Sequence, residues 1–355
     1  EHALRWRMVG RAAHRHRAAV LDRHEHRAGV GAVVRAGAAD DAAAARAVVG
    51  GHRGFAVGTA DCMRPACRRC ATLRPVAGIR TVTFADGARV PALGLGTWKM
   101  GERPETRRAE VDALVHGFDL GLTLVDTAEM YAEGGAELVV GRALAGRRDR
   151  VFVVSKVYPH NAGRRSAVAA CERSLARLAI DRIDLYLLHW RGRIPLAETV
   201  EAFERLRRDG KIARWGVSNL DVDDLDELAG VTQGPACAAD QVLFHLGERG
   251  IERGVLPRCR AWPMPVIAYS PFDEGRLLDH PDLVRIAREA GTTAVTLALA
   301  WVIAHDDVIA IPKAARRVHV DAIRAAADLA ITPDLSAALD RAFPPPRKRT
   351  PLAML

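Results

Sequence analysis

The 355-residue chain lacks the features that mark several large classes of protein. Its most continuous apolar stretch, Ala294–Ala304, falls well short of the roughly 18 residues that a membrane-spanning helix needs. Its first residues include no apolar segment of the kind found in secretory signal peptides, so none is expected. Six cysteines in a chain of this length do not form a disulfide framework, which favours a reducing, cytoplasmic location. These absences exclude an integral membrane protein and a small secreted module.

Positive charge is concentrated in one part of the chain. The net charge is +9, and residues 1–78, with fourteen arginines, no lysine and six acidic residues, carry +8 of it. This segment is rich in Ala, Arg, His and Gly and has no sustained periodicity, so we expect a disordered extension. Arginine can bind nucleic-acid phosphates, but the segment lacks the interleaved aromatic residues that stack on bases. The composition therefore favours an extension without a nucleic-acid function; salt-dependent RNA or DNA binding, lost on deleting residues 1–78, would indicate otherwise.

Three cysteines of this extension have a spacing that resembles part of a zinc site. Cys62, Cys67 and Cys70 are spaced Cys-x4-Cys-x2-Cys, and His52 could complete a set of four ligands. A strong zinc signal has two Cys-x2-Cys pairs, whereas this segment has one. We interpret the three residues as unpaired thiols and predict no metal site.

A regular alternation of strand and helix patterns begins at residue 79. The segments Thr81–Phe84 and Arg89–Pro91 flank Asp86-Gly87 and predict a β-hairpin. Eight short apolar runs follow as strand candidates: Ala92–Trp98, Leu122–Asp126, Val151–Lys156, Ile183–His189, Ala213–Ser218, Cys237–Gln241, Pro265–Tyr269 and Val308–Ile311. Helical patterns between them include Thr106–Leu120, Arg164–Ala179, Leu196–Arg208, Val222–Ala229 and His280–Ala290. This order predicts one α/β domain over residues 79–355, a (β/α)8 TIM barrel preceded by the hairpin. A doubly wound sheet is the alternative, but no Gly-x-Gly-x-x-Gly follows any strand.

Ionisable residues end three consecutive strand candidates. They are Asp126, Lys156 and His189, and Tyr131 lies five residues after Asp126. In a TIM barrel the chemistry lies at the carboxyl ends of the strands. Any one of these residues alone could be a hydrogen-bonded core group, since a buried charge needs a partner. All four on one rim favour a catalytic site.

The four side chains suit the transfer of a proton to an oxygen atom. A tyrosine titrates near pH 10, and we expect Lys156, held by Asp126, to lower the pKa of Tyr131 and make it a proton donor. His189 can hydrogen-bond a substrate oxygen. The four side chains do not form a metal-ligand set, and there is no hydroxyl or thiol nucleophile with an adjacent base. It therefore suits the reduction of a carbonyl group, with hydride from a nicotinamide cofactor.

The motifs around these residues resemble the aldo-keto reductase superfamily of (β/α)8 oxidoreductases, from about Thr81 onward. The motifs are Leu124–Tyr131, Val154–Lys156, Leu175–Leu178, Asp184–Trp190, Gly210–Lys211, Trp215–Asn219, Ala268–Pro271 and Ile311–Lys313. The resemblance implies NAD(P)H-dependent reduction of aldehydes or ketones and assigns Asp126, Tyr131, Lys156 and His189 to the catalytic tetrad. The histidine at the fourth tetrad position, His189, resembles that of the members that reduce carbonyl groups. The members that reduce a conjugated double bond have Glu at that position.

The same resemblance implies a cofactor site. It assigns Ser218, Asn219 and Gln241 to the nicotinamide carboxamide and Tyr269 to stacking on the nicotinamide ring. The loop over the pyrophosphate begins with Ser270, Pro271 and Phe272.

The adenosine end departs from the family pattern. Where the family often has Ser or Thr, then Arg and Asn, this chain has Ala314, His319 and Ile323. Lys313, with Arg316 or Arg317, could still pair with a 2′-phosphate. NADPH is therefore the expected cofactor, with NADH as the alternative.

Two tryptophans and the last segment of the chain bear on the substrate. Trp98 and Trp190 are the expected walls of an apolar pocket for a small-molecule carbonyl substrate. The short segment after Phe343 predicts an open pocket. Two other hypotheses remain: a nucleotide-binding regulatory module with little turnover, and a nucleic-acid-associated protein. The intact tetrad favours the enzyme, because a sensor does not need all four groups.

Overall fold

The structure, a computed structural model, describes residues 78–355. The predictions made for the extension, including its disorder and the state of Cys62, Cys67 and Cys70, lie outside the described residues. Within residues 78–355 no single helix is long and apolar enough to span a membrane; only a pair of helices joined by an 88° bend meets the length and composition together.

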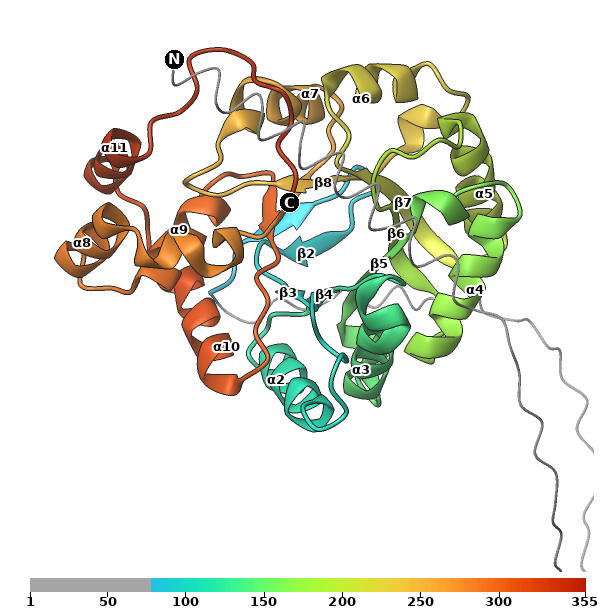
Figure 1. Cartoon of the computed structure of the whole chain (residues 1–355), viewed down its shortest axis with the longest axis horizontal. Helices are drawn as coiled ribbons and strands as arrows, with labels where there is room; N and C mark the ends of the chain where they lie inside the picture. The colour runs from blue at the N-terminus through green and yellow to red at the C-terminus, as the bar shows by residue number, and fades with distance from the viewer. Residues whose placement is uncertain (1–77) are drawn as a thin grey trace, which may run out of the picture. The chain divides into compact units, whose positions relative to one another are not determined.

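Eight parallel strands form one sheet in sequence order. They are β3 (Leu95–Gly96), β4 (Leu124–Asp126), β5 (Phe152–Val157), β6 (Ile183–Leu188), β7 (Ile212–Ser218), β8 (Asp240–Leu243), β9 (Val266–Tyr269) and β10 (Val308–Ala310). Leu93 pairs with Ala310 and Gly96 with Lys313, so the last strand meets the first (Figure 1). Each strand lies within or next to an apolar run of the sequence, and the predicted (β/α)8 fold is confirmed.

Helices follow the strands and surround the sheet (Figure 1). They are α2 (Arg107–Asp119), α3 (Gly135–Leu144), α4 (Ser166–Leu178), α5 (Leu196–Arg208), α6 (Val222–Ala229), α7 (Val255–Ala261), α8 (Pro281–Glu289), α9 (Ala294–Ile303), α10 (Arg317–Arg324) and α11 (Pro333–Ala342). Local sequence explains the starts of two helices: Asp221 and Asp224 form a capping box at α6, and Thr293 caps α9. The α5 and α6 bounds agree with the sequence patterns.

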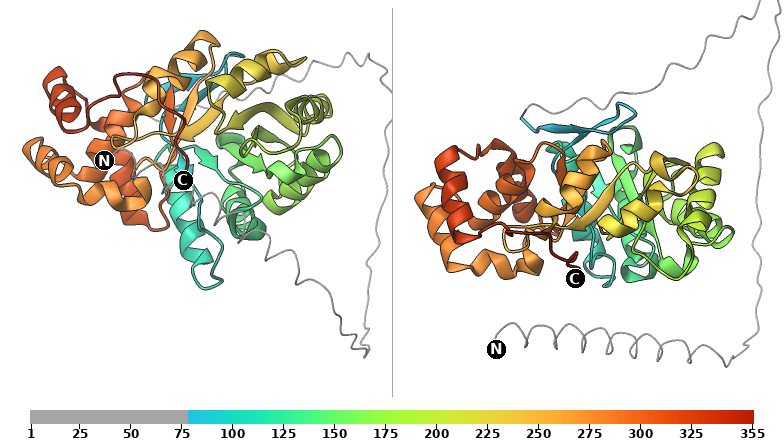
Figure 2. Two further views of the ribbon diagram at one scale, coloured as in Figure 1. Left: turned by 45° about the horizontal axis from the view of Figure 1, so that its top comes forward. Right: turned by 90° about the horizontal axis from the view of Figure 1, so that it is seen from above.

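A β-hairpin lies at the amino ends of the barrel strands, on the side away from the last residues of the chain (Figure 2). Its strands, β1 (Thr81–Thr83) and β2 (Arg89–Pro91), are antiparallel, as predicted. Just before β1, the Arg80 guanidinium donates hydrogen bonds to the carbonyl oxygens of Ile303, His305, Asp306 and Val308. These bonds join the hairpin segment to the turn that leads into β10.

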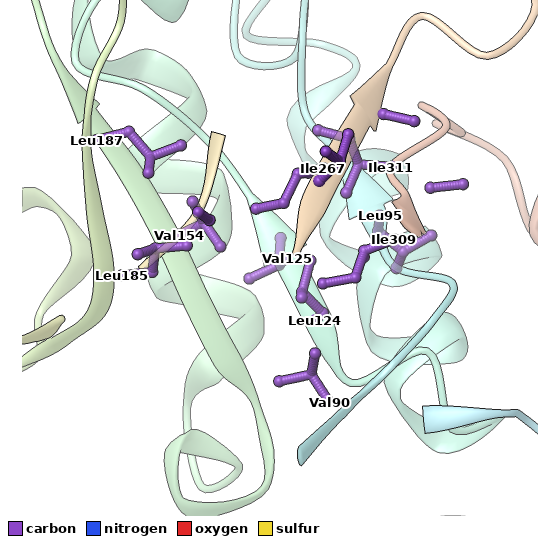
Figure 3. Close-up of a cluster of buried hydrophobic side chains, with 14 of the residues drawn as sticks. Val90, Leu95, Leu124, Val125, Val154, Leu185, Leu187, Ile267, Ile309 and Ile311 are labelled. Carbon is purple, nitrogen blue, oxygen red and sulfur yellow. The ribbon is translucent and has the colours of Figure 1, made fainter. Parts of the chain in front are cut away.

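The barrel interior is filled by apolar side chains from several strands. Val154, Leu185, Leu187, Ile267 and Ile309 are fully buried and gather there (Figure 3). The seam between β3 and β10 is so close that a Cβ on Gly96 would lie 2.6 Å from the carbonyl oxygen of Ile311. Only glycine fits at that position of the seam.

Candidate active site

The alternation of side chains along each strand brings the predicted site residues to one end of the barrel. Side chains two residues apart on a strand point to the same side, and five of the predicted site residues follow a buried apolar residue by two positions. The pairs are Leu124 and Asp126, Val154 and Lys156, Leu187 and His189, Ile267 and Tyr269, and Ile311 and Lys313. The site is therefore the next layer above the core of Figure 3.

Asp126 and Lys156 form a buried ion pair. Lys156 Nζ donates to Asp126 Oδ1 at 2.5 Å and to the carbonyl oxygen of Thr127 at 3.0 Å. Asp126 Oδ2 accepts a hydrogen bond of 2.8 Å from Gln241 Nε2. Burial raises the pKa of Asp126 and lowers that of Lys156, and in each case the partner's charge opposes the shift. Both carboxylate oxygens have partners, so the position of the ammonium is fixed from two sides.

Tyr131 lies next to this pair. Lys156 Nζ is 3.4 Å from Tyr131 Oη, and Tyr131 is 9% exposed. Burial first, and then the charge of Asp126, raise the pKa of Tyr131 well above 10. The expected lowering of this pKa is wrong, because burial and the charge of Asp126 outweigh the stabilisation of the phenolate by the Lys156 ammonium. Tyr131 is therefore a neutral phenol that keeps its proton.

His189 faces Tyr131 across the site. Their rings are 5.6 Å apart in an edge-to-face arrangement. Burial first, and then the charge of Lys156, lower the pKa of His189 well below 6.5. Its Nδ1 is buried and has no hydrogen-bond partner among residues 78–355. The imidazole is thus neutral at neutral pH.

Four residues expected at the nicotinamide are connected by hydrogen bonds beside His189. Ser218 Oγ donates to the carbonyl oxygen of Gln241 at 2.8 Å, and Asn219 Nδ2 donates to Ser218 Oγ at 3.1 Å. Tyr269 Oη donates to Asn219 Oδ1 at 2.9 Å. Asn219 also donates to the carbonyl oxygen of His189 at 3.3 Å. Because Gln241 also holds Asp126, it joins this group to the tetrad, a connection that sequence reasoning missed.

The residues expected at the phosphates lie on neighbouring loops. Ser270, Pro271 and Phe272 directly follow Tyr269, and Ser270 has a positive φ of 47°. Lys313 is exposed and makes no hydrogen bond or ion pair with another described side chain. Arg317 is the first residue of α10, whose amino end has no side-chain cap and no acidic residue in its first turn. An uncapped helix end of this kind is suited to bind a phosphate.

The three residues that depart from the family pattern at the adenosine end differ in exposure to solvent. Ala314 and Ile323 are buried, whereas His319 is exposed.

Lys99 is a further exposed cation with no described partner, at a positive φ of 63°, directly after Trp98. Sequence reasoning missed Lys99, although its place at the end of the first strand region was a usable signal.

A series of aromatic contacts lines the site. Trp98 lies edge-to-face on Tyr131 at 5.0 Å, and Trp190 lies 4.9 Å from the His189 ring. The series continues from Trp190 to Tyr158 at 5.4 Å. Trp98 and Trp190 are therefore next to the tetrad, where pocket walls were expected, and Tyr158 is an addition.

The segment after Phe343 returns to the mouth of the barrel instead of leaving it open. Arg349 donates to Asp223 at 3.0 Å, and the backbone N–H of Leu355 lies 3.4 Å from Tyr269 Oη. A cavity of about 530 Å³ lies beneath this segment, with His245 and Asp273 in its lining. None of the tetrad lines this cavity, so it lies beside the site.

Within the described residues, no cluster of His, Cys, Asp or Glu is arranged to hold a metal ion.

The chain belongs to the aldo/keto reductase family, whose model matches residues 92–343. It is 50% identical over 281 residues to the methylglyoxal reductase YeaE of Escherichia coli strain K12, covering 78% of this chain and 99% of that protein. It is 32% identical over 240 residues to the glyoxal reductase of Bacillus subtilis strain 168, covering 68% and 84% of the two chains. A crystal structure of an aldo/keto reductase from Klebsiella pneumoniae in complex with NADP and acetate is also similar, with 53% identity, a TM-score of 0.76 and coverage of 78% and 100%.

Proposed function

We propose that this chain reduces small aldehydes and ketones to alcohols with NADPH as the hydride donor. The observation that carries the proposal is the hydrogen-bonded set of Asp126, Lys156 and Tyr131, with neutral His189 beside it at the barrel mouth. The relatives named as methylglyoxal and glyoxal reductases support small dicarbonyls as substrates.

NADPH, when bound, supplies the hydride that reaches the carbonyl carbon. Ser218, Asn219 and Gln241 would hold the carboxamide, and Tyr269 would stack on the nicotinamide ring. Ser270, Pro271 and Phe272 would cover the pyrophosphate. Lys313 and Arg317 would receive the 2′-phosphate, because Lys313 is an exposed cation without a described partner and Arg317 begins α10, whose amino end has no side-chain cap.

The proton comes from Tyr131 Oη in this mechanism. The substrate oxygen accepts hydrogen bonds from Tyr131 and His189, and the phenol proton moves to that oxygen as its negative charge develops. The ammonium of Lys156, 3.4 Å from the phenol oxygen, stabilises the phenolate that is left. Asp126 keeps the ammonium in place through the transfer. The raised pKa of free Tyr131 ensures that the donor carries its proton when substrate arrives.

A direct assay tests the proposal. The purified full chain is mixed with NADPH and with methylglyoxal, other small aldehydes and keto-sugars, and cofactor oxidation is followed by absorbance. Turnover of small aldehydes with NADPH is expected. Tight NADPH binding with no turnover on any carbonyl would instead favour a regulatory module.

A further inference from the structure

Tyr158 lies one layer above the tetrad on the wall of the site. Val154 and Lys156 point to the barrel interior, and the backbone stays extended through Tyr158, with φ −62° and ψ 140°. Its side chain therefore projects on the side of Lys156, roughly 6–7 Å closer to the mouth at the ordinary rise of a strand. The ring contacts His160 at 4.6 Å and Trp190 at 5.4 Å, and Trp190 in turn touches His189, which supports a place for Tyr158 on the same wall.

The Tyr158 hydroxyl is available as a hydrogen-bond donor. The side chain is half-buried, and its Oη has no hydrogen-bond partner among the described residues. Burial and the nearby charge of Glu129 raise the pKa of Tyr158, so the group keeps its proton at neutral pH. A donor without a protein partner in the wall of a site is free to bind an acceptor on a substrate.

Glu129 fixes this tyrosine relative to the proton donor. Its Oε1 accepts hydrogen bonds from the backbone N–H of Tyr158 at 2.7 Å and from Asn161 Nδ2 at 3.0 Å. The carboxylate is 7% exposed, and Arg173 lies 3.6 Å from its other oxygen. Glu129 itself lies between Asp126 and Tyr131 in the loop after β4. One carboxylate thus ties the loop that carries Tyr131 to the loop that carries Tyr158.

We propose that Tyr158 Oη donates a hydrogen bond to the second oxygen of a 1,2-dicarbonyl substrate while Tyr131 and His189 hold the oxygen of the carbonyl being reduced. Glu129 is the positioning residue that sets the separation of the two hydroxyls. The proposal rests on the proposed carbonyl reduction and names its substrate class. Tyr158 keeps its proton throughout: hydride goes to one carbonyl carbon, the proton of Tyr131 goes to that oxygen, and the second carbonyl is unchanged. A substrate with one oxygen leaves this donor without an acceptor, and sites built around such a donor discriminate against it.

Two aldehydes of equal chain length test the assignment. Methylglyoxal and propanal differ in having a carbonyl or a methylene group next to the aldehyde. Tyr158→Phe should lower kcat/KM for methylglyoxal by about 2- to 12-fold, the range of one neutral hydrogen bond. The value for propanal should stay within about twofold. Comparing each substrate with itself in the wild-type enzyme removes the effect of aldehyde hydration.

Tyr186→Phe is the matched control, because Tyr186 is fully buried on β6 and packs against Phe203, away from the mouth. It should leave unchanged the preference for methylglyoxal, that is, the ratio of kcat/KM for methylglyoxal to kcat/KM for propanal. Glu129→Ala should reduce this kcat/KM ratio as Tyr158→Phe does. Glu129→Gln should retain it, since the amide oxygen still accepts hydrogen bonds from the backbone N–H of Tyr158 and from Asn161 Nδ2.

Three outcomes would overturn the assignment. The first is an equal loss of kcat/KM on both substrates in Tyr158→Phe, and the second is no loss of kcat/KM on methylglyoxal in that variant. The third is an unchanged ratio of the two kcat/KM values in a folded Glu129→Ala variant. A wild-type enzyme that reduces neither aldehyde would refute the proposed function itself, and this can be read before any variant is made.

Discussion

At the amino ends of the barrel strands, the Arg80 guanidinium donates to four backbone carbonyl oxygens, and Val82, Phe84 and Val90 of the hairpin segment are buried. At the carboxyl ends, Lys99 and Lys313 have no described partner, and the Nδ1 atom of His189 is buried without one. The bonds of Arg80 hold the fold together, whereas the two exposed ammonium groups at the mouth are available to a ligand. Removal of the Tyr131 hydroxyl or the Lys313 ammonium at the mouth should alter activity or cofactor affinity at nearly constant stability, and removal of the Arg80 guanidinium at the hairpin end should do the reverse.

The largest expected effect is at the mouth. Tyr131→Phe should lower kcat/KM for carbonyl reduction by roughly 10²–10⁴-fold, since general acid catalysis contributes that much. Steady-state NADPH oxidation measures the loss. Affinity for NADPH and the melting temperature should be nearly unchanged, because only a hydroxyl is removed. Wild-type turnover in this variant would show that the proton comes from another group.

Lys313→Met should weaken the binding of NADPH by roughly ten- to a hundred-fold and should weaken the binding of NADH much less. Only NADPH brings a 2′-phosphate to the ammonium, and a charge-assisted hydrogen bond contributes about 1.5–3 kcal/mol. Titration of intrinsic tryptophan fluorescence with each cofactor measures both affinities. Equal losses for the two would place the ammonium away from the 2′-phosphate.

At the other end of the barrel, Arg80→Met should lower the free energy of unfolding by about 1.5 kcal/mol, the scale of a hydrogen bond to a charged group. Chemical denaturation measures the change. The kcat/KM of the folded protein should equal that of the wild type. A loss of activity at unchanged stability would contradict the division between the two ends.

The smallest expected effect is on the pH dependence of stability, and it concerns a buried acidic residue outside the tetrad. Asp240 is fully buried on β8, and burial raises its pKa well above the usual range, although the nearby backbone of Leu220 and Gln241 opposes the shift. The folded state then holds a proton that the unfolded state releases above about pH 3.9. Stability contributed by this group therefore falls as pH rises from that value toward the raised pKa.

Asp240→Asn removes this titration. The melting temperature of the variant should exceed that of the wild type by more at pH 8 than at pH 5. Asp126→Asn is the contrasting change, because it takes the charge from a carboxylate whose two oxygens are both bonded, and it should destabilise. A constant difference across pH for Asp240→Asn would mean that Asp240 is ionised in the folded protein.

Much of the fold could be predicted because the strands are short, apolar and bounded by polar residues. The tetrad followed, since three ionisable residues end three successive strands. The helix α9 was not recognised, because Ala294–Ile303 is apolar on every side and has no amphipathic period. The direction of the Tyr131 pKa was wrong because it depends on burial and on the distance from Asp126 to Lys156, and neither can be read from a motif.

Contacts between distant segments were also out of reach. The bond from Gln241 to Asp126 joins residues 115 positions apart. The return of the segment after Phe343 to Tyr269 depends on arginines of other loops, such as Arg249, which donates to the carbonyl oxygen of Phe343 at 2.7 Å. Tyr158 was missed because the sequence marks Lys156 as a strand end and does not show that the backbone stays extended two residues further.

The two-residue offset between core and site has a consequence for how such a chain can change over time. A substitution at His189 or Lys156 alters the chemistry and leaves Leu187 and Val154 in the core. A single-residue insertion or deletion in β6 would instead turn Leu185, Leu187 and His189 to the opposite face together. In these strands, exchange of amino acids is therefore open to natural selection, whereas changes in length are penalised in the core and in the site at once.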